Sequence, residues 1–379
     1  EVFQRTKRIY DLYAGAGSER IREVDDNVGH SDPPLFLREA RQWMQRWLKG
    51  DPTPLREETN SPPKENAEDL ACLAKLPADA INYKVQNQFT TSVSLKNSAS
   101  QAAWATRRAE LLAQLKAKVF RWFPTGKIAF ETKASTRSGG YMPKYADYKE
   151  VSFQSEDGVR IRAQLLTPKH PSRDAPLLIY VKRSGDSIYF MDTDELLPLL
   201  GRYTVLILSP RFTEQSLSAS EYTDIERTAV WVGRTIAAMQ VWDILRAVSW
   251  AADEGKIGAS SISLHGKGDM GILGLYAALF DDRIKQIILN DPPASHWQRP
   301  ALLNVLRVTD IPEVAGALAP RRLVSLTKLP VTFDFTQRIY RLERASNQFT
   351  QSGSLPEALE IWKEPPPGPS RTGARSGTP

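Results

Sequence analysis

One glycine-rich motif in the sequence has the spacing of a site that carries chemistry. Residues 261–265 are typical of a strand, and an apolar run typical of a buried helix begins at Met270. Between them, Gly266 and Gly271 are small enough to let the strand and the helix approach closely. Enzymes place a nucleophilic serine at the apex of such a strand–turn–helix. The apex here is Gly268, which has no side chain and therefore no nucleophile.

Two other chemistries are open to the same turn. A glycine-rich turn before a helix can bind phosphate. However, the stretch from Lys267 to Asp269 has neither the Lys-Ser/Thr pair of a P-loop nor the glycine spacing of a dinucleotide site. Asp269 would be a carboxylate nucleophile if the turn were shifted by one residue, although Lys267 would then stand where a small residue is needed. Asp269 therefore stays open as a non-standard nucleophile.

The chain has four histidines and one cysteine, Cys72, and they do not have the spacing of a metal site. We therefore expect no metal and no cofactor. His296 follows Asp291 by five residues in a loop after a strand, so a displaced acid–base pair is one hypothesis. The competing interpretation is a hydrogen-bonded loop histidine beside Trp297. His30 follows a glycine in a loop before a helix and, taken alone, is typical of a surface histidine.

An internal repeat is the strongest sign of how the chain is organised. Residues 2–12 reappear as residues 332–342, with six identical residues at a constant offset of 330. Two unrelated amphipathic helices could match by chance, but the shared Arg-Ile-Tyr favours common ancestry. The offset is the size of a whole module rather than of a solenoid repeat. The chain is therefore predicted to begin near the end of one module and to run through most of a second.

The pattern of strands and helices predicts an α/β fold. Strands alternate with helices after residue 148, which favours a doubly wound, mostly parallel sheet with helices on both faces, preceded by a mainly helical segment. An amphipathic pattern predicts a further helix over 98–123, and 21–24 is a short strand candidate. The predicted strands are 149–154, 159–167, 176–181, 204–208, 261–265, 284–289 and 323–326, and the predicted helices lie near 192–201, 221–254, 271–281 and 332–345.

These elements predict four parts of the chain. Residues 1–50 are expected to be the C-terminal remnant of a first module, and 51–123 a linker with a helical connecting segment. The second module is expected over 124–346. Residues 347–379 are expected to be a disordered tail, because repeated Pro, Gly, Ser and Arg cannot build a core.

The charge pattern argues against several classes of partner. The net charge is +6, but 50 basic residues are scattered among 44 acidic ones, with no basic block interleaved with aromatics. We therefore expect no nucleic-acid partner. No stretch approaches the eighteen or so apolar residues of a membrane span, and the first residues are not those of a signal peptide. A single cysteine also excludes an internal disulfide.

Several short stretches in the second half of the chain match a known pattern of residues. They are 266–278, 282–284, 290–296, 302–307, 310–313 and 319–323. Over roughly residues 145–345 the chain resembles bacterial acetylxylan-esterase-like α/β-hydrolases of the tandem-module type, and more distantly glucuronoyl esterases. The resemblance implies an α/β-hydrolase fold, an acetylated polysaccharide or a small ester as substrate, an upstream module in the same polypeptide, and export to the periplasm or the cell exterior.

The resemblance also implies a catalytic triad: a serine at the elbow, an acid after a late strand, and a histidine in a Gly-His turn before the last helix. Gly268 replaces that serine, residues 327–332 contain no carboxylate, and no histidine follows residue 345. The second module is therefore predicted to be a pseudoenzyme, with a supporting or carbohydrate-binding role as the alternative. The matching Gly-His is Gly29-His30, which makes His30 the candidate base of the first module, and we expect it to lie away from Gly268.

Overall fold

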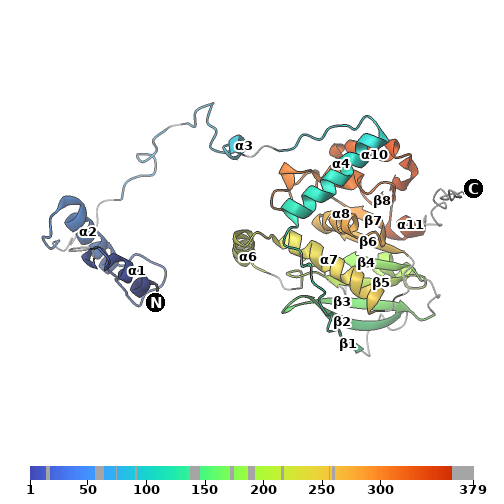
Figure 1. The fold of residues 1–379 in the computed structure, drawn as a ribbon, viewed down its shortest axis with the longest axis horizontal. Helices are drawn as coiled ribbons and strands as arrows, with labels where there is room; N and C mark the ends of the chain where they lie inside the picture. The colour runs from blue at the N-terminus through green and yellow to red at the C-terminus, as the bar shows by residue number, and fades with distance from the viewer. Residues whose placement is uncertain are drawn as a thin grey trace, which may run out of the picture. The chain divides into compact units, whose positions relative to one another are not determined.

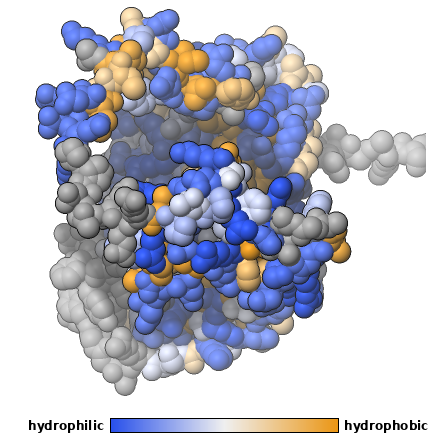
Figure 2. All heavy atoms as spheres, turned by 90° about the vertical axis from the view of Figure 1, so that its left-hand side faces the viewer, coloured by the Kyte–Doolittle hydropathy of each residue, from blue (hydrophilic) through white to orange (hydrophobic). Residues whose placement is uncertain are grey.

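The computed structural model divides the chain into two compact units, residues 1–80 (unit 1) and 81–379 (unit 2) (Figure 1). The residues from 81 to 123, predicted as part of a connecting segment, therefore belong to the second unit. The face seen in Figure 2 is mostly hydrophilic, with hydrophobic residues scattered over it. The residues that the structure describes are 1–13, 18–55, 64–73, 75–89, 92–136, 146–170, 175–186, 193–214, 217–255, 257 and 261–360.

Unit 2 is built on one twisted sheet, which has nine strands among the described residues, in the order β1-β2-β3-β5-β4-β6-β7-β8-β9. The strands from β5 to β9 are parallel, and β1, β2 and β3 add an antiparallel edge. This confirms the predicted mostly parallel sheet. The strands are β1 (Lys133–Thr136), β2 (Ala146–Glu156), β3 (Val159–Pro168), β4 (Leu177–Val181), β5 (Thr204–Ser209), β6 (Ile262–Lys267), β7 (Ile284–Asn290), β8 (Arg322–Ser325) and β9 (Phe349–Gln351).

Helices cover both faces of this sheet, as predicted. Alternate residues of a strand point to opposite faces, so Leu177 and Ile179 join one core and Leu178 and Tyr180 join the other. The first core contains α4, α7, α8, α9 and α10, and the second contains α5 and α11. The helices are α3 (Gln86–Phe89), α4 (Gln101–Gln114), α5 (Thr193–Leu196), α6 (Ala219–Trp231), α7 (Ile236–Asp253), α8 (Asp269–Phe280), α9 (Ile311–Gly316), α10 (Asp334–Leu342) and α11 (Leu355–Glu360).

The predicted helix over 221–254 is two helices in the structure. Gly233 adopts a positive φ of 77°, which an α-helix cannot contain. The side chain of Thr235 then accepts a hydrogen bond from the backbone N–H of Ala238 and caps α7. The apolar pattern is continuous over both helices. The only sequence signal of the break between them is a glycine followed by a capping threonine.

The prediction of a disordered tail that begins at residue 347 is wrong for residues 347–360. Residues 349–351 form β9 at the edge of the sheet, and 355–360 form α11. Leu355, Ala358 and Leu359 of this helix are fully buried. A strand and a helix this short show no clear period, so the composition of the following residues dominated the prediction. Residues 361–379 lie outside the described residues.

Unit 1 consists mainly of two helices, α1 (Val2–Tyr10) and α2 (Pro34–Lys49). Pro34 is the first residue of α2, where its missing N–H removes no hydrogen bond of the helix, and Gly50 ends the helix with a φ of 70°. The strand expected over 21–24 is wrong, because this segment pairs with no other strand among the described residues. None of the described helices is long and apolar enough to cross a membrane.

Replacing Gly266 with alanine should destabilise unit 2. A Cβ atom there would lie 2.5 Å from the backbone nitrogen of Gly271, and backbone cannot move aside as a flexible side chain can. Overpacking of this kind costs about 1–3 kcal/mol, which urea unfolding at pH 7 would measure. Gly201→Ala is the matched control, because nothing lies within 4 Å of its Cβ position. Equal stability of the two variants would contradict the close approach of β6 and α8.

Candidate functional site

The topology brings the ends of three strands together around Gly268. Strands β4 and β6 are neighbours in the sheet, but the chain continues from β4 to β5 on one side and from β6 to β7 on the other. In open α/β sheets, ligands bind at the switch point between two such strands. Val181 of β4 is level with Gly266 of β6, and Lys267 is level with Asn290 of β7. The loops that follow β4, β6 and β7 therefore form one edge, and the candidate site lies on it.

Gly268 is the apex of a sharp turn between β6 and α8, as predicted. It has φ 56° and ψ −126°, a conformation that strains any residue with a side chain. Its backbone N–H donates to the carbonyl group of Asn290 at 2.8 Å, which ties the turn to the end of β7. A Cβ on Gly271 would lie 2.8 Å from the carbonyl oxygen of Gly266, so strand and helix meet backbone to backbone. The turn therefore has the shape of a nucleophile elbow without the nucleophile.

Asp269 is the first residue of α8 and not the apex of the turn. Its Oδ1 lies 3.3 Å from Nε of Arg299, an ion pair that lacks hydrogen-bond geometry, so this buried oxygen has no hydrogen-bond partner. Burial raises the pKa of Asp269, while the guanidinium groups of Arg299 and Arg183 act to lower it. Nη2 of Arg299 is also 3.9 Å from the Cβ position of Gly268. An arginine therefore lies beside the space that a nucleophilic side chain would use.

Arg183, in the loop after β4, is bound to Asp186. Its backbone N–H donates to one carboxylate oxygen of Asp186 at 2.9 Å, and Nη2 donates to the other at 3.1 Å. In α/β-hydrolases, an N–H of this loop helps to stabilise the oxyanion of the reaction intermediate. The Arg183 N–H is already used by a carboxylate, so it is not free for that task.

The loop after β8, where the triad acid is expected, has no carboxylate. It holds Thr327, whose Oγ1 accepts a hydrogen bond from the backbone N–H of Asp291 at 2.8 Å. Ser325 donates to the carbonyl group of Thr327 at 2.7 Å and fixes this loop further. Asp291 itself follows β7 with a positive φ of 52°. It lies near enough to Arg183 for its charge to help raise the pKa of that arginine, although Asp186 is the main cause.

The turn before α11, where the family pattern expects the triad histidine, contains no histidine. Gly353 and Ser354 form the turn between β9 and α11, the last strand and the last helix of the described residues. The backbone N–H of Gly353 donates to a carboxylate oxygen of Glu357 at 2.8 Å, which stabilises the turn. The sequence analysis missed this turn, although a Gly-Ser pair just before a short apolar run was the available signal.

His296 is buried and both of its ring nitrogens are engaged. Nδ1 lies 2.9 Å from the carbonyl oxygen of Pro300, so it carries the proton and donates. Nε2 lies 2.7 Å from the hydroxyl group of Tyr276 and accepts. Burial lowers the pKa of His296 and favours this neutral form. The structure thus places His296 as a hydrogen-bonded loop histidine, and it has no nitrogen left to form an acid–base pair with Asp291.

Two residues singled out in the sequence remain, His30 and Lys267. His30 is an exposed residue of unit 1, in the turn before α2, and its expected separation from Gly268 stays a prediction. Lys267 forms a long ion pair of 3.9 Å with Glu195. Among the described residues, no group of three or more His, Cys, Asp and Glu residues is placed to hold a metal.

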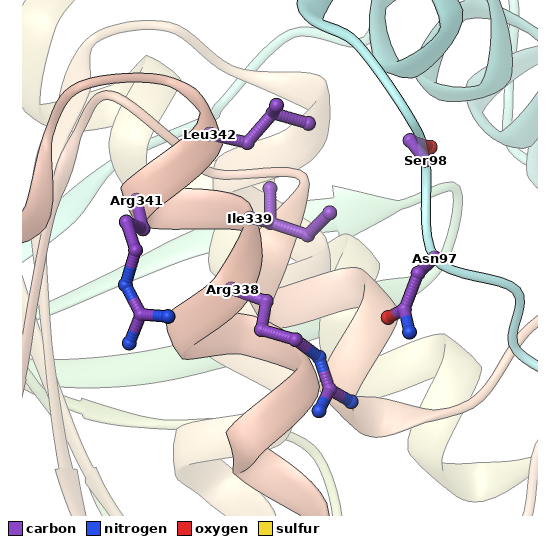
Figure 3. Close-up of a pocket in the computed structure, with 6 residues that line it drawn as sticks. All are labelled: Asn97, Ser98, Arg338, Ile339, Arg341 and Leu342. Carbon is purple, nitrogen blue, oxygen red and sulfur yellow. The ribbon is translucent and has the colours of Figure 1, made fainter.

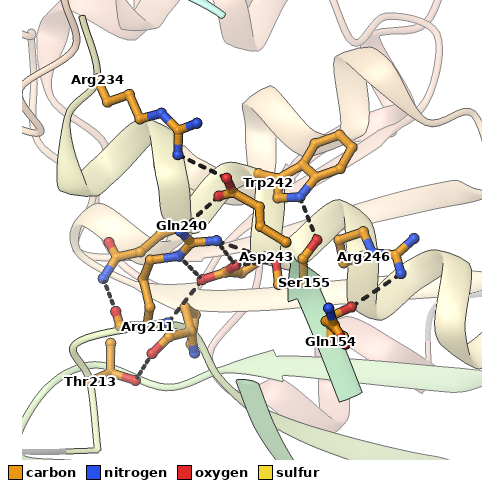
Figure 4. A network of polar contacts seen from close by, with 11 residues as sticks. Gln154, Ser155, Arg211, Thr213, Arg234, Gln240, Trp242, Asp243 and Arg246 are labelled. Atoms are coloured by element: carbon orange, nitrogen blue, oxygen red, sulfur yellow. Dashed lines mark hydrogen bonds and ion pairs between the residues drawn. The ribbon is translucent and has the colours of Figure 1, made fainter. Parts of the chain in front are cut away.

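A second polar cluster lies where the β2–β3 turn meets α7 (Figure 4). Arg211 is bound by both carboxylate oxygens of Asp243, at 2.6 and 2.9 Å, and by Glu156 at 2.8 Å. Arg234 binds the other oxygen of Glu156 at 2.8 Å. Burial acts to lower the pKa of Arg211, but the two carboxylates raise it above its ordinary value. Two cations and two anions neutralise one another here, so the cluster joins chain segments and offers no reactive group.

Comparison with known proteins identifies the fold. No family model and no curated protein matches the chain. Among solved structures, a protein of Bacteroides fragilis described as an acetyl xylan esterase has a TM-score of 0.59 at 12% identity, over 71% of this chain and 81% of that one. A methylesterase has a TM-score of 0.52 at 13% identity, over 67% of this chain and 60% of its own. A glucuronoyl esterase from Solibacter usitatus scores 0.47. At these identities the likeness shows the α/β-hydrolase fold alone.

His265, on β6 just before the elbow, should make the protein sensitive to acid. Its ring is fully buried, Nδ1 donates to the carbonyl group of Ile288 at 3.1 Å, and Nε2 has no partner. Burial lowers its pKa from 6.5 to about 4. Between these pH values the unfolded chain binds a proton that the folded chain does not, so stability falls as the pH drops from 6.5 towards 4.

The total loss from this residue is about 3 kcal/mol, and urea unfolding at a series of pH values would measure it. His265→Gln serves as the comparison, because it keeps His296 and every other titrating group. As the pH falls from 6.5 to 4, the unfolding free energy of the wild type should fall steadily relative to that of the variant. Parallel curves would show that His265 is not held neutral.

Proposed function

We propose that unit 2 is a non-hydrolytic α/β-hydrolase module, related to carbohydrate esterases, which binds polysaccharide at its elbow without cleaving it. The proposal is supported by the residues at the three positions where the family pattern expects the triad: Gly268 at the apex of the elbow, Thr327 in the loop after β8, and Ser354 in the turn before α11. Glycine has no nucleophile, threonine has no carboxylate to orient a base, and serine cannot take up a proton at neutral pH. The names of the similar structures support carbohydrate esters as the ligand class.

Asp269 is the main alternative nucleophile, and its surroundings argue against it. A carboxylate nucleophile forms an ester intermediate that water must then cleave with the help of a base. Both ring nitrogens of His296 are engaged in hydrogen bonds, and the ring of His265 is fully buried with a lowered pKa. The ion pair with Arg299 also neutralises the charge with which Asp269 would attack.

The groups that surround the elbow are suited to binding. Trp297, two residues before Arg299, is 55% exposed. Tyr222 of α6 is 48% exposed, and burial and the charges of Glu226 and Asp269 raise its pKa. Exposed aromatic rings beside polar groups are typical of ligand grooves, in which rings supply contact area and charged groups fix orientation. Exposed aromatic and charged side chains of this kind suit sugar rings with hydroxyl, acetyl or carboxylate groups.

The purified chain should hydrolyse p-nitrophenyl acetate and acetylated xylan no faster than a buffer blank. Loss of a triad nucleophile reduces turnover by roughly 10⁶-fold, and here the other two positions are also replaced. Gly268→Ser should not restore activity, because the turn before α11 holds no histidine to take the proton of the serine, and both ring nitrogens of His296 are already engaged. Saturable turnover by the wild type that disappears in Asp269→Asn or His296→Ala would overturn the proposal.

Binding should be seen as retardation of the native protein in gels that contain acetylated xylan. Trp297→Ala should reduce the association constant about tenfold or more, because truncating an aromatic contact residue costs above 1 kcal/mol. Trp231→Ala is the matched control, since this tryptophan is 80% exposed at the far end of α6. If both variants migrate as the wild type does, the elbow is not the binding site.

A further inference from the structure

A pocket opens on the surface of unit 2 between α10 and the segment that leads into α4 (Figure 3). It has a volume of about 380 Å³, and we call it the α10 pocket. Concave sites of this order of size are typical of small-molecule binding. The residues that line it are Asn97, Ser98, Arg338, Ile339, Arg341 and Leu342.

Both walls of the α10 pocket are held in place by contacts inside unit 2. The hydroxyl group of Tyr340 in α10 donates to the carbonyl group of the residue before β8 at 2.7 Å. Trp104 of α4 packs edge-on against Phe335 of α10, with 6.5 Å between the ring centroids. On the other wall, the backbone N–H of Val93 donates to the carbonyl group of Leu306 at 2.7 Å. The pocket is therefore a preformed feature of unit 2.

Two arginines at this pocket have no counter-ion among the described residues. Arg338 and Arg341 are exposed, and neither side chain forms an ion pair or a hydrogen bond with any residue that the structure describes. Asp334 lies four residues before Arg338 in α10, the spacing at which opposite charges pair along a helix, yet it is not a partner of this arginine. By contrast, Arg107 of α4 is bound by both carboxylate oxygens of Glu313, at 2.7 and 2.8 Å. Both positive charges of the pocket are therefore available to a ligand.

The lining combines the groups that recognise a hydroxylated anion. The planar guanidinium group of an arginine matches the oxygens of a carboxylate or a phosphate group. Figure 3 shows the guanidinium group of Arg338 extended on the side of Asn97, whereas Arg341 extends on the other side of α10. The side chains of Asn97 and Ser98 each donate and accept hydrogen bonds, as sugar hydroxyl groups require. Ile339 and Leu342 supply apolar contact for the carbon skeleton of such a ligand.

The α10 pocket is a separate site from the elbow. Strands β6, β7 and β8 are parallel, so their carboxyl ends lie at one edge of the sheet and their amino ends at the other. Gly268 follows the carboxyl end of β6. Tyr340, next to Arg341 in α10, is bound to the residue before the amino end of β8. The pocket therefore lies toward the edge of the sheet opposite the elbow.

We propose that the α10 pocket binds a small organic anion that carries hydroxyl groups, either a sugar acid or a sugar phosphate. The anionic group lies at Arg338 and Asn97, Arg341 adds a second positive charge, and the carbon skeleton packs on Leu342. A carboxylate and a phosphate group share the chemistry that Arg338 recognises, so titration with each of them separates the two sources. The proposal does not depend on ligand binding at the elbow.

Isothermal titration calorimetry of the chain 1–379 at low ionic strength tests this site with glucose, glucuronate and glucose 6-phosphate, which differ only at carbon 6, and with inorganic phosphate. Glucuronate or glucose 6-phosphate should bind at millimolar concentration to one site per chain, and the tighter ligand identifies the anionic group. Binding should weaken as salt is added, because salt screens exposed charges. Absence of binding by both sugar anions, or equal binding of neutral glucose, would overturn the proposal. Inorganic phosphate that binds as tightly as the sugar anions would also overturn it, since the pocket would then hold an adventitious ion only.

Variants show whether the binding belongs to this pocket. Arg338→Ala should reduce the association constant about tenfold or more, because hydrogen bonds to a charged group are lost. Arg338→Lys keeps the charge without the planar fork and should lie between the wild type and the alanine variant. Arg227→Ala is the matched control, since this arginine is exposed on α6 and does not line the pocket. No loss in Arg338→Ala, or an equal loss in Arg227→Ala, would contradict the assignment of the site.

Discussion

The contact between β6 and α8 is the constraint on which the rest of the site depends. Backbone meets backbone at Gly266 and Gly271, so neither position accepts a side chain, and the turn between them is forced into the positive φ of Gly268. In α/β-hydrolases a turn of this geometry presents the nucleophile. Here the same geometry is present, but the residue at its apex is a glycine. The elbow is therefore a property of the packing of the sheet against its central helix, and it does not depend on catalysis.

Ion pairs lie around this turn. Arg299 pairs with Asp269, and Arg183 pairs with Asp186, so charges that lie at the strand ends are largely neutralised in pairs. Pairing lowers the electrostatic cost of keeping charged groups in a partly buried edge. The same principle holds in the cluster of Arg211, where opposite charges join the β2–β3 turn to α7. These charged residues therefore hold chain segments of unit 2 together.

The sequence predicted those features that depend on local pattern. The strands β2 to β8 and the elbow at Gly268 follow from apolar runs and from glycine spacing. The sequence did not reveal β9 and α11, because a three-residue strand and a six-residue helix have no measurable period. Arg183 and Arg299 were also missed, since they lie far apart in the sequence and meet Asp269 only through the strand order.

The central claim is that the elbow of unit 2 holds no group able to form a covalent bond with an ester. Intact mass spectrometry after incubation with an excess of a fluorophosphonate or a p-nitrophenyl ester tests it most directly, because every hydrolase with a covalent intermediate gains the mass of the bound group. We predict that peptide mapping finds no adduct on residues 266–271 at any time point. A single stoichiometric adduct that peptide mapping places on residues 266–271 would contradict the account.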